Sequence, residues 1–508
     1  MSLSDPEKGH ALQERSEHED TISNSTLDDE SRPSTPHSGQ HERHSTNIEA
    51  AAQAHNASPS LKRTQSNKSA VLARIASRIT TRSITNPPPP PDGGLKAWTQ
   101  VGCAWLVLFT TWGYVNSFGS FQTYYSTLLP DETASTISWI GSVQVWLTFF
   151  VGAFSGRLLD AGLFLPTFAV GMAMQLAGIF GMSWCTEYWQ LMLTQGILTG
   201  IGGGIFFCPS MGLLATYFSN KRGVAIGIAT TGNSVGGMIY PVVVRELLPK
   251  LGFAWTVRVI GFVNLGCLVL ALCFMRPRLP PRKSGPIMDP KAFHEPVYML
   301  FVAGFCFMIG SVYWTFYYVR SEFLSSVNRR STFTDKVYQI ASFGVQVIGL
   351  SYASSTLLII IINGVGLPFR VIPPLLSDRY GPLNIILPAL FATALVAFTF
   401  VAVHDTLGLY LFTIFYGITT AAFQCLLPVT VASLTTNLNM VGTRLGMAFS
   451  AISFAALTWP PIGGAIIGLQ HGKYQGAQIW AAVSALAGAL LMLTARVKMN
   501  GWTVRKKC

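Results

Sequence analysis

The sequence predicts an all-α membrane protein with twelve transmembrane helices, and three observations support this fold class. Half of the 508 residues are hydrophobic, whereas only 11% are charged, less than half of the ~25% that is usual in soluble domains. The mean hydropathy is +0.40. After Trp98, apolar segments close to the ~20 residues that a helix needs to cross a bilayer follow one another. So long a chain with so few charges cannot cover a water-soluble surface, and a soluble protein is excluded.

The first 91 residues form a different region. They are rich in Ser, Thr, Glu, His and Pro, a composition too polar to offset the entropy lost on folding, so we expect a disordered cytoplasmic tail over residues 1–91. Within the basic segment 62–82, Arg74, Arg78 and Arg82 recur at every fourth position. This spacing favours either a short helix lying on anionic lipids or a disordered basic linker.

Twelve apolar segments make up most of the remaining chain, and short polar stretches separate them. In chain order, we place the transmembrane helices at 97–118, 137–156, 165–184, 190–215, 224–244, 256–275, 297–318, 349–369, 384–403, 407–432, 441–468 and 478–496.

The charges between these spans predict their orientation. Lys and Arg dominate before the odd-numbered spans and after the last one, whereas three of the alternate loops carry acids (Asp131 and Glu132, Glu187, and Asp405) and a fourth carries Lys473. Two alternate loops break this pattern, one of them with Arg245, Lys250 and Arg258. The majority predicts that both termini are cytoplasmic. We expect a multi-pass protein of the plasma membrane, with the vacuolar membrane as the alternative.

Three residue pairs, each six spans apart, recur at spacings of 218, 219 and 222 positions. They are Asp160 with Asp378, Pro209 with Pro428, and Arg222 with Arg444. This near-constant spacing predicts a duplicated unit, which gives two pseudo-symmetric six-helix bundles with a substrate site between them. The expected division is an N-terminal bundle at 92–275, a cytoplasmic linker at 276–295, a C-terminal bundle at 296–496 and a short cytoplasmic tail at 497–508.

Glycines recur at every fourth position in the fourth and fifth spans. They are Gly196, Gly200 and Gly204 in the fourth, and the pairs Gly223/Gly227 and Gly232/Gly236 in the fifth. Small residues at this spacing let helix backbones approach closely. We interpret them as surfaces on which helices rock against one another, the alternative being static packing.

The sequence holds few groups that could catalyse a reaction. It has no G-x-x-x-x-G-K-[ST] motif, no H-E-x-x-H motif and no paired carboxylate within a span. We therefore predict no enzyme, no catalytic residue, no metal and no cofactor. The net charge of +12 lies beside hydrophobic spans, where it sets topology, so nucleic acid is not an expected partner.

Several local sequences resemble a known family. They are Asp92–Trp98 (DGGLKAW), Asn116–Tyr125 (NSFGSFQTYY), Tyr217–Gly227 (YFSNKRGVAIG), Gly442–Ser450 (GTRLGMAFS) and Pro460–Gly464 (PPIGG). In combination they are similar to fungal monocarboxylate-porter homologues of the major facilitator superfamily, from Asp92 to about Arg496. The resemblance implies a twelve-helix transporter that moves a small organic acid by alternating access.

Arg370 is the main candidate for substrate binding. It closes the eighth span, where an arginine costs ~2.5–3.5 kcal/mol on insertion scales and normally faces a cavity or a partner. Its planar guanidinium suits a carboxylate, and the resemblance implies a substrate-related arginine here. The alternative is an interfacial arginine that reaches the lipid headgroups.

Two departures from the family pattern argue against strong proton coupling. Proton-coupled animal relatives carry an Asp and a Lys at the positions that hold Gly366 and Asn116 in this sequence. Since no carboxylate lies in the middle of a predicted span, we expect facilitated or weakly proton-coupled transport.

Polar and aromatic side chains within the spans are further candidates for the substrate pathway. Hydrogen bonding between helices is the alternative for each amide, and an outer aromatic belt is the alternative for the seventh-span aromatics. The candidates are Asn116, Gln195, Trp314, Tyr317, Asn363 and Gln424.

Charged residues at helix ends are candidates for gating. The superfamily's gating loops pair a carboxylate with a base or with a helix N-terminus, and the alternative is simple loop solvation. The candidates are Asp92, Arg157, Asp160, Arg222, Asp378, Arg379 and Arg444.

The sequence therefore predicts a secondary transporter that moves a monocarboxylate or a related small organic acid. One alternative is efflux of a bulky secondary metabolite or uptake of a vitamin-like heterocycle. Another is a nutrient sensor that signals through its N-terminal tail. The expected partners are a small organic solute and the lipid bilayer, and no oligomeric state is predicted.

Overall fold

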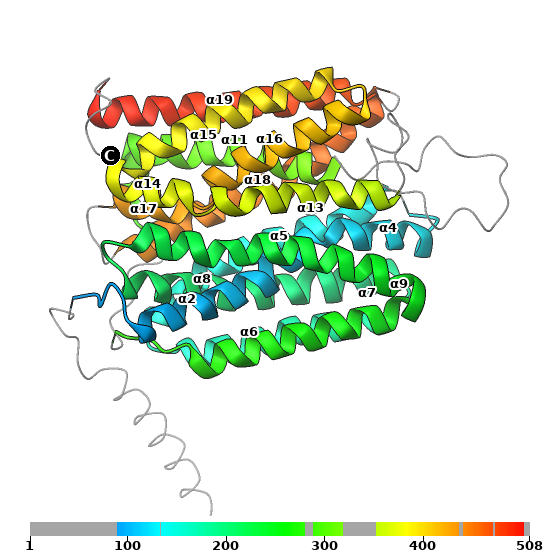
Figure 1. Cartoon of the computed structure of the whole chain (residues 1–508), viewed down its shortest axis with the longest axis horizontal. Coiled ribbons are helices and arrows are strands. Elements are labelled where there is room, and N and C mark those ends of the chain that lie inside the picture. The colour runs from blue at the N-terminus through cyan, green and yellow to red at the C-terminus, as the bar shows by residue number, and fades with distance from the viewer. Residues whose placement is uncertain are drawn as a thin grey trace, which may run out of the picture. The chain divides into compact units, whose positions relative to one another are not determined.

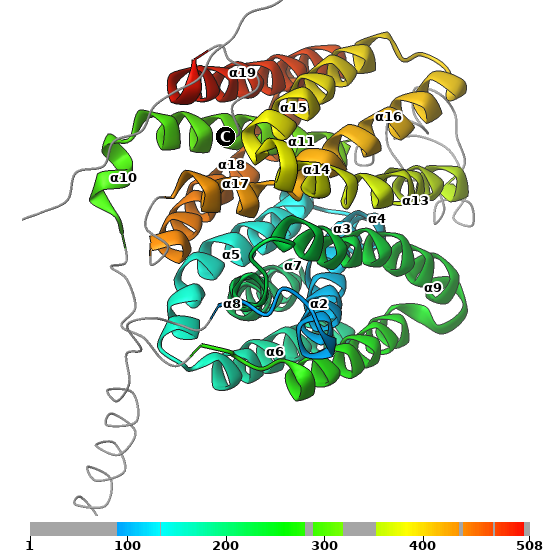
Figure 2. The same cartoon turned by 60° about the vertical axis from the view of Figure 1, so that its left-hand side comes forward.

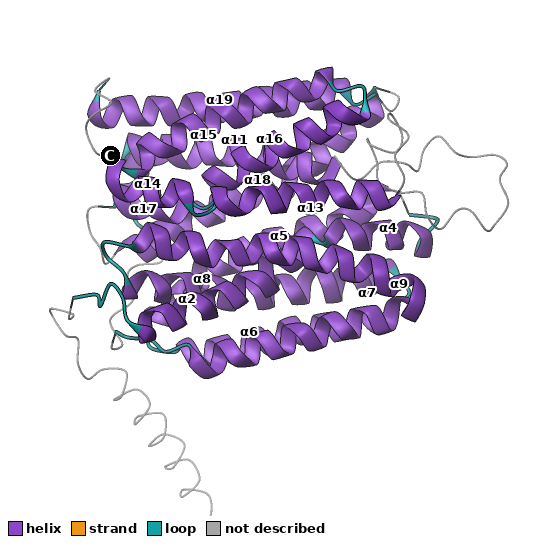
Figure 3. Ribbon diagram, in the orientation of Figure 1, coloured by secondary structure: helices purple, strands orange, loops and turns teal. Residues whose placement is uncertain are grey.

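The computed structural model describes residues 89–132, 134–279, 288–318, 352–435, 440–470 and 473–501. Within these residues every regular element is helical, as Figure 3 shows, and no strand is present. The predicted fold class, an all-α membrane protein, is thereby confirmed. The basic segment 62–82 and most of the predicted tail lie outside the described residues, as does the middle of the predicted linker.

The first group of helices packs α5 and α6 on α8, and α2 on α9. Figure 2 shows this group in blue to green on the lower side of the bundle. Its elements are α2 (Leu95–Leu108), η1 (Phe109–Gly113), α3 (Tyr114–Asn116), α4 (Phe118–Leu128), α5 (Ala134–Asp160), α6 (Phe164–Gly181), η2 (Met182–Trp184), α7 (Tyr188–Leu191), η3 (Met192–Leu198), α8 (Thr199–Tyr217) and α9 (Arg222–Phe274).

The second group packs α11 on α18 and α19, α13 on α16, and α15 on α19. A short helix, α10 (Pro290–His294), precedes it. Its elements are α11 (Pro296–Tyr318), α13 (Tyr352–Phe369), α14 (Ile372–Tyr380), α15 (Pro382–Thr399), η5 (Phe400–Ala402), α16 (Thr406–Gln424), α17 (Leu427–Leu434), α18 (Val441–Leu469) and α19 (Gln475–Asn500).

Ten helices among the described residues are long and apolar enough to cross a membrane. One of them, α9, has 53 residues and is interrupted at Gly252, whose φ of 73° and ψ of 173° are not helical. Glycine adopts this positive φ without the steric cost that a side chain brings, so α9 turns back there and forms two arms (Figure 2). Counting both arms and adding the broken segment from α2 to α4 gives the twelve predicted spans.

Two seams join the groups. At the first, α5 packs on α18 through aromatic rings. The ring centroids of Phe149 and Phe449 lie 5.4 Å apart, and Phe454 lies 5.9 Å from Phe150 and 6.2 Å from Trp146. We call these five residues the aromatic seam.

The second seam lies between the first arm of α9 and helices α13 and α14. A methyl group added at Gly227 would lie 2.7 Å from the carbonyl oxygen of Arg370, and one added at Gly237 would lie 2.8 Å from the side chain of Asn363. Gly223 approaches Pro374 in the same way. We call Gly223, Gly227 and Gly237 the glycine seam, since only a residue without a side chain allows so close an approach.

The other glycine repeat packs within the first group. Methyl groups added at Gly200 and Gly204 would lie 3.0 Å and 2.8 Å from backbone oxygens of α5. In the fifth-span repeat, Gly232 and Gly236 also pack within the first group, against the backbone of Trp105 and Gly113. Only the pair Gly223 and Gly227 of that repeat belongs to the glycine seam, which joins the two groups.

The first turn of α2 and the last turn of α19 lie at the same end of the bundle, on the left in Figure 1. An even number of spans places both ends of a chain on one side of a membrane. That this side is the cytoplasm stays a prediction from the charge pattern.

Candidate functional site

Arg370 lies in the break between α13 and α14, where Pro368 comes before it and Pro373 and Pro374 follow. Proline lacks the N–H group that a continuous helix needs, and the break brings the arginine inside the bundle. Its side chain is 6% exposed. The predicted position in the protein interior is therefore observed, and the alternative of an arginine reaching the headgroups does not apply.

Two neutral groups accept hydrogen bonds from the guanidinium. Nε donates to Ser234 Oγ of α9 at 2.7 Å, and Nη2 donates to Gln424 Oε1 of α16 at 3.4 Å. Among the described residues, no carboxylate forms an ion pair with Arg370. A buried cation without a counter-ion attracts a negative group strongly.

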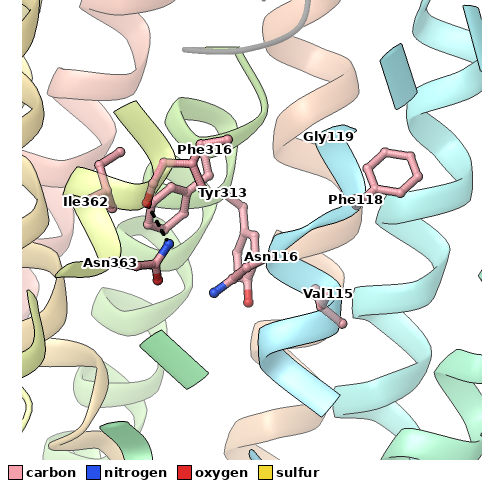
Figure 4. A pocket seen from close by; sticks show the side chains of 9 residues that line it. Val115, Asn116, Phe118, Gly119, Tyr313, Phe316, Ile362 and Asn363 are labelled. Carbon is pink, nitrogen blue, oxygen red and sulfur yellow. Dashed lines mark hydrogen bonds between the residues drawn. The ribbon is translucent and has the colours of Figure 1, made fainter. Parts of the chain in front are cut away.

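A small pocket lies where α3, α4, α11 and α13 meet, and Arg370, Ser234 and Gln424 are not among the residues that line it. Its volume is about 50 Å³, below the ~300–1,000 Å³ of sites that enclose drug-sized ligands. Figure 4 shows Asn116 and Asn363 pointing into the same gap from opposite sides, with Tyr313 and Phe316 of α11 beside them. The lining residues are Val115, Asn116, Phe118, Gly119, Tyr313, Phe316, Ile359, Ile362 and Asn363.

One residue that lines the pocket, Asn116, is connected to the arginine through two hydrogen bonds and the peptide bond between Asn233 and Ser234. Asn116 Nδ2 donates to Asn233 Oδ1 at 2.7 Å, and the next residue of α9 is Ser234, which accepts from Arg370. Asn363 Nδ2 donates to the carbonyl oxygen of Ile359 in its own helix at 3.0 Å (Figure 4). Asn116, Asn233, Ser234, Arg370 and Gln424 thus form a polar chain that crosses from the first helix group to the second.

The other predicted substrate residues lie elsewhere. Gln195 is fully buried in the first group and accepts a hydrogen bond from the Tyr125 hydroxyl. Trp314 is fully buried against Gly463 of α18 and does not line the pocket in Figure 4. The side chain of Tyr317 lies outside the described residues.

Several residues of the site were not among the predicted binding residues, and Ser234, Tyr313 and Phe316 are three of them. Ser234 was missed because a serine in an apolar helix usually bonds to its own backbone, as Ser210 does. Tyr313 and Phe316 were missed because all aromatics of the seventh span look alike in the sequence. The helical period, which turns residues 313 and 316 to the same face, was the available signal.

The predicted gating residue Asp378 lies at the glycine seam. Its Oδ1 atom accepts a hydrogen bond of 3.3 Å from the backbone N–H of Gly223, in the first turn of α9. Arg222 beside it donates to the carbonyl oxygen of Phe218. A carboxylate at a helix N-terminus is stabilised by the helix dipole, so this contact favours the arrangement in which α9 and α14 are close together.

Asp92 fixes the chain before α2 to the turn before α9. Its Oδ1 accepts from the backbone N–H groups of Ser219 and Asn220, and its own N–H donates to the carbonyl oxygen of Tyr217 at 3.2 Å. Asp92 adopts a positive φ of 49°, which is uncommon for a residue other than glycine.

Arg444, in the first turn of α18, binds two carboxylates that the sequence did not indicate. Its Nε lies 2.9 Å from Asp289 Oδ2, and its Nη1 lies 2.7 Å from Glu295 Oε2. The Tyr298 hydroxyl donates to the Arg444 carbonyl oxygen at 2.6 Å. Arg444 and Asp289 are both buried, so α18 is firmly connected to the segment that precedes α11.

The remaining predicted gating residues differ in exposure. Arg157 is half-buried in the last turn of α5, and Arg379 is exposed on α14. The side chain of Asp160 lies outside the described residues.

Gly366 faces α16 rather than an open space. A methyl group there would lie 3.0 Å from Cβ of Ala421 and 3.3 Å from the carbonyl oxygen of Gly417. A carboxylate at this position would require α13 and α16 to move apart.

A bundle of ten or more apolar membrane helices, crossed by a polar chain between two helix groups, defines a multi-pass membrane transporter. The comparison with known families is more specific. Residues 101–439 match the Major Facilitator Superfamily, and the chain belongs to this family.

Curated relatives are fungal transporters. An MFS-type transporter of Gibberella zeae is 40% identical over 414 residues, which cover 81% of this chain and 88% of the relative. The MFS transporter asaE of Aspergillus flavus is 33% identical over 420 residues, which cover 82% of this chain and 90% of the relative. The aspyridones efflux protein apdF of Emericella nidulans is 31% identical and covers 82% of both chains.

Proposed function

We propose that this protein exports a largely apolar, weakly acidic secondary metabolite, whose anionic end is bound by Arg370. The proposal follows the predicted efflux alternative rather than the predicted transport of a small monocarboxylate. The name of one relative, the aspyridones efflux protein apdF, supports this proposal.

The buried guanidinium of Arg370 is the observation that carries the proposal. Its acceptors among the described residues, Ser234 and Gln424, are neutral, so a negative group of the substrate would supply the missing counter-charge. The residues that line the small pocket include Phe118, Tyr313 and Phe316, so the lining is largely apolar and aromatic. This lining suits an apolar part of the substrate, and the volume of about 50 Å³ encloses only a fraction of a bulky metabolite in this arrangement of the helices.

The experiment compares an acidic compound with its own methyl ester. In proteoliposomes with the full chain, we expect wild type to transport the acid faster than the ester. Arg370→Gln should lower transport of the acid at least tenfold, since a charge-assisted hydrogen bond contributes ~1.5–3 kcal/mol, and should leave the ester nearly unchanged. Arg370→Lys keeps the charge but loses the planar fork, so we expect an intermediate rate.

Arg245→Gln serves as the matched control, because Arg245 already pairs with Glu246 at 3.0 Å and does not line the pocket. Equal transport of acid and ester by wild type, or an equal loss of both in Arg370→Gln, would contradict an anion site at Arg370. A panel that adds lactate and pyruvate distinguishes export of apolar acids from the monocarboxylate function that the family resemblance implies.

Coupling to protons is expected to be weak. None of the residues that line the pocket is a carboxylate, and proton coupling requires a group that loads and releases a proton in the pathway. An inward or outward gradient of one pH unit should therefore change the initial rate of an impermeant, permanently charged substrate less than twofold. A rate that rises tenfold with the gradient would show that a group outside this pocket couples the proton.

A further inference from the structure

Arg258 lies between two tryptophan rings at the end of the bundle where α9 turns back. Its guanidinium carbon is 5.1 Å from the ring centroid of Trp255, and 5.4 Å from that of Trp184, the last residue of η2. At these distances both rings make cation–π contacts with the guanidinium. Two elements far apart in the sequence therefore place one positive charge between two indoles.

The two rings lie on the outside of the helix bundle. Trp184 is 71% exposed and Trp255 is 55% exposed. Both lie at the end of a span, since Trp184 ends η2 directly after α6 and Trp255 lies at the start of the second arm of α9, three residues after Gly252. Tryptophan is enriched at this depth, where hydrocarbon gives way to headgroups, so these rings and Arg258 face the lipid.

The guanidinium has unused donors. Its Nε donates to Ser183 Oγ at 3.3 Å, and neither Nη1 nor Nη2 donates a hydrogen bond to another described residue. The acids nearest in the chain are engaged elsewhere: Glu246 binds Arg245 and Lys250, and Glu187 accepts from Trp189 Nε1. Among the described residues, Arg258 therefore has no anionic partner.

We propose that Arg258, Trp184 and Trp255 bind the phosphate group of a membrane phospholipid in the leaflet at this end of the bundle. The two Nη nitrogens form a planar fork that matches two phosphate oxygens. The indole rings cover the glycerol and the first methylene groups of the same lipid, which partly desolvates the charge pair and strengthens it.

This site also accounts for a basic loop that departs from the charge pattern of the sequence. Arg258 belongs to one of the two loops where positive charges lie on the predicted outer side. A phosphate held there would neutralise the charge, and the tryptophans would fix the second arm of α9 at a constant depth in the membrane.

The test counts lipids bound to the purified full chain by native mass spectrometry in a mild detergent. The probes are dioleoyl phosphatidylglycerol, dioleoyl phosphatidylcholine and dioleoylglycerol, which share acyl chains but differ in the phosphate. We expect wild type to retain one phospholipid of either kind and to bind dioleoylglycerol at least tenfold more weakly. Arg258→Gln should weaken phospholipid binding about tenfold, and Arg258→Lys should fall between the two.

Arg245→Gln is the matched control, because Arg245 lies on the same helix but already pairs with Glu246 at 3.0 Å, and we expect it to bind lipid as wild type does. Equal retention by wild type and Arg258→Gln would overturn the proposal, as would equal binding of dioleoylglycerol and phospholipid. Displacement of the lipid by millimolar inorganic phosphate would also contradict the proposal, because it would show that the site binds free anions rather than a phospholipid. If Arg258→Gln does not fold, Arg258→Lys and Trp184→Ala provide the same comparison.

Discussion

Between the two helix groups, the seam of α5 with α18 differs in chemistry from the seam of α9 with α13 and α14. The aromatic seam consists of large rings, and its Phe454 is half exposed, so part of it faces lipid. The glycine seam brings backbones together and is continued by the buried polar pair of Ser234 and Arg370. The contact of α5 with α18 also includes one close backbone approach, because a methyl group added at Gly446 would lie 2.7 Å from the carbonyl oxygen of Ala153. The two seams therefore differ in their ring content and in the buried charge, which only the glycine seam carries.

This difference suggests a division of roles. The glycine seam carries the charged group and is held closed by the Asp378 contact with α9, so its opening and closing would change access to Arg370. The aromatic seam would keep the groups together while they move. The following predictions test this division, from the largest expected effect to the smallest.

The largest effect is expected from a side chain in the glycine seam. Gly227→Val places methyl groups where even one Cβ would lie 2.7 Å from the carbonyl oxygen of Arg370, and backbone atoms cannot give way as a flexible side chain can. We expect at least a tenfold loss of transport in proteoliposomes, with Gly227→Ala showing a smaller loss. Gly266→Val on the second arm of α9 is the control, since nothing lies within 4 Å of its added Cβ. Normal transport by Gly227→Val would show that the two groups need not approach this closely.

A smaller effect is expected where the glycine seam meets the polar chain. Ser234→Ala removes the acceptor of the Arg370 Nε hydrogen bond at 2.7 Å and should raise KM for an acidic substrate about three- to tenfold, because the guanidinium loses its fixed orientation. The same change at Ser210, which bonds only to its own helix, should leave KM unchanged. An unaltered KM in Ser234→Ala, measured from initial rates, would exclude a positioning role for Ser234.

The smallest effect is expected in the aromatic seam. Phe454→Leu removes ring contacts with Trp146 and Phe150, a change that costs ~0.5–1.5 kcal/mol per aromatic pair. We expect a lower melting temperature of the purified protein, with a transport rate within twofold of wild type. A loss of transport as large as that of Gly227→Val would mean that both seams share one role.

Hydrophobic length was enough to predict most of the fold. The span predicted at 441–468 corresponds to α18 (Val441–Leu469), and that at 297–318 to α11 (Pro296–Tyr318). The π-helical segments η1 and η3 were not predicted, because a single wider turn changes neither the composition nor the apolar period. Pro428 was only a weak indication of the break after Gln424, because a proline does not always break a helix. Pro209, for example, lies within the unbroken helix α8.

The site was predictable in part because charge is rare within the spans. Arg370 and Gln424, which lie close together in the structure, were identified as polar groups in apolar surroundings. The partners Ser234, Asp289 and Glu295 were not, because a serine and two linker acids are common in their local contexts. Their roles depend on contacts across more than 100 residues of sequence, which no local pattern contains.

The double ion pair of Arg444 has a mechanical consequence. Residues 288–295 are fastened to the start of α18 through the buried Asp289 and the half-exposed Glu295, so Arg444 keeps one carboxylate partner if the other is lost. Helix α18 is also the helix that packs on the rings of α5 in the aromatic seam. The ion pairs of Arg444 and the aromatic seam therefore belong to the same helix, so residues 288–295 would stay attached to α18 when one helix group rotates against the other.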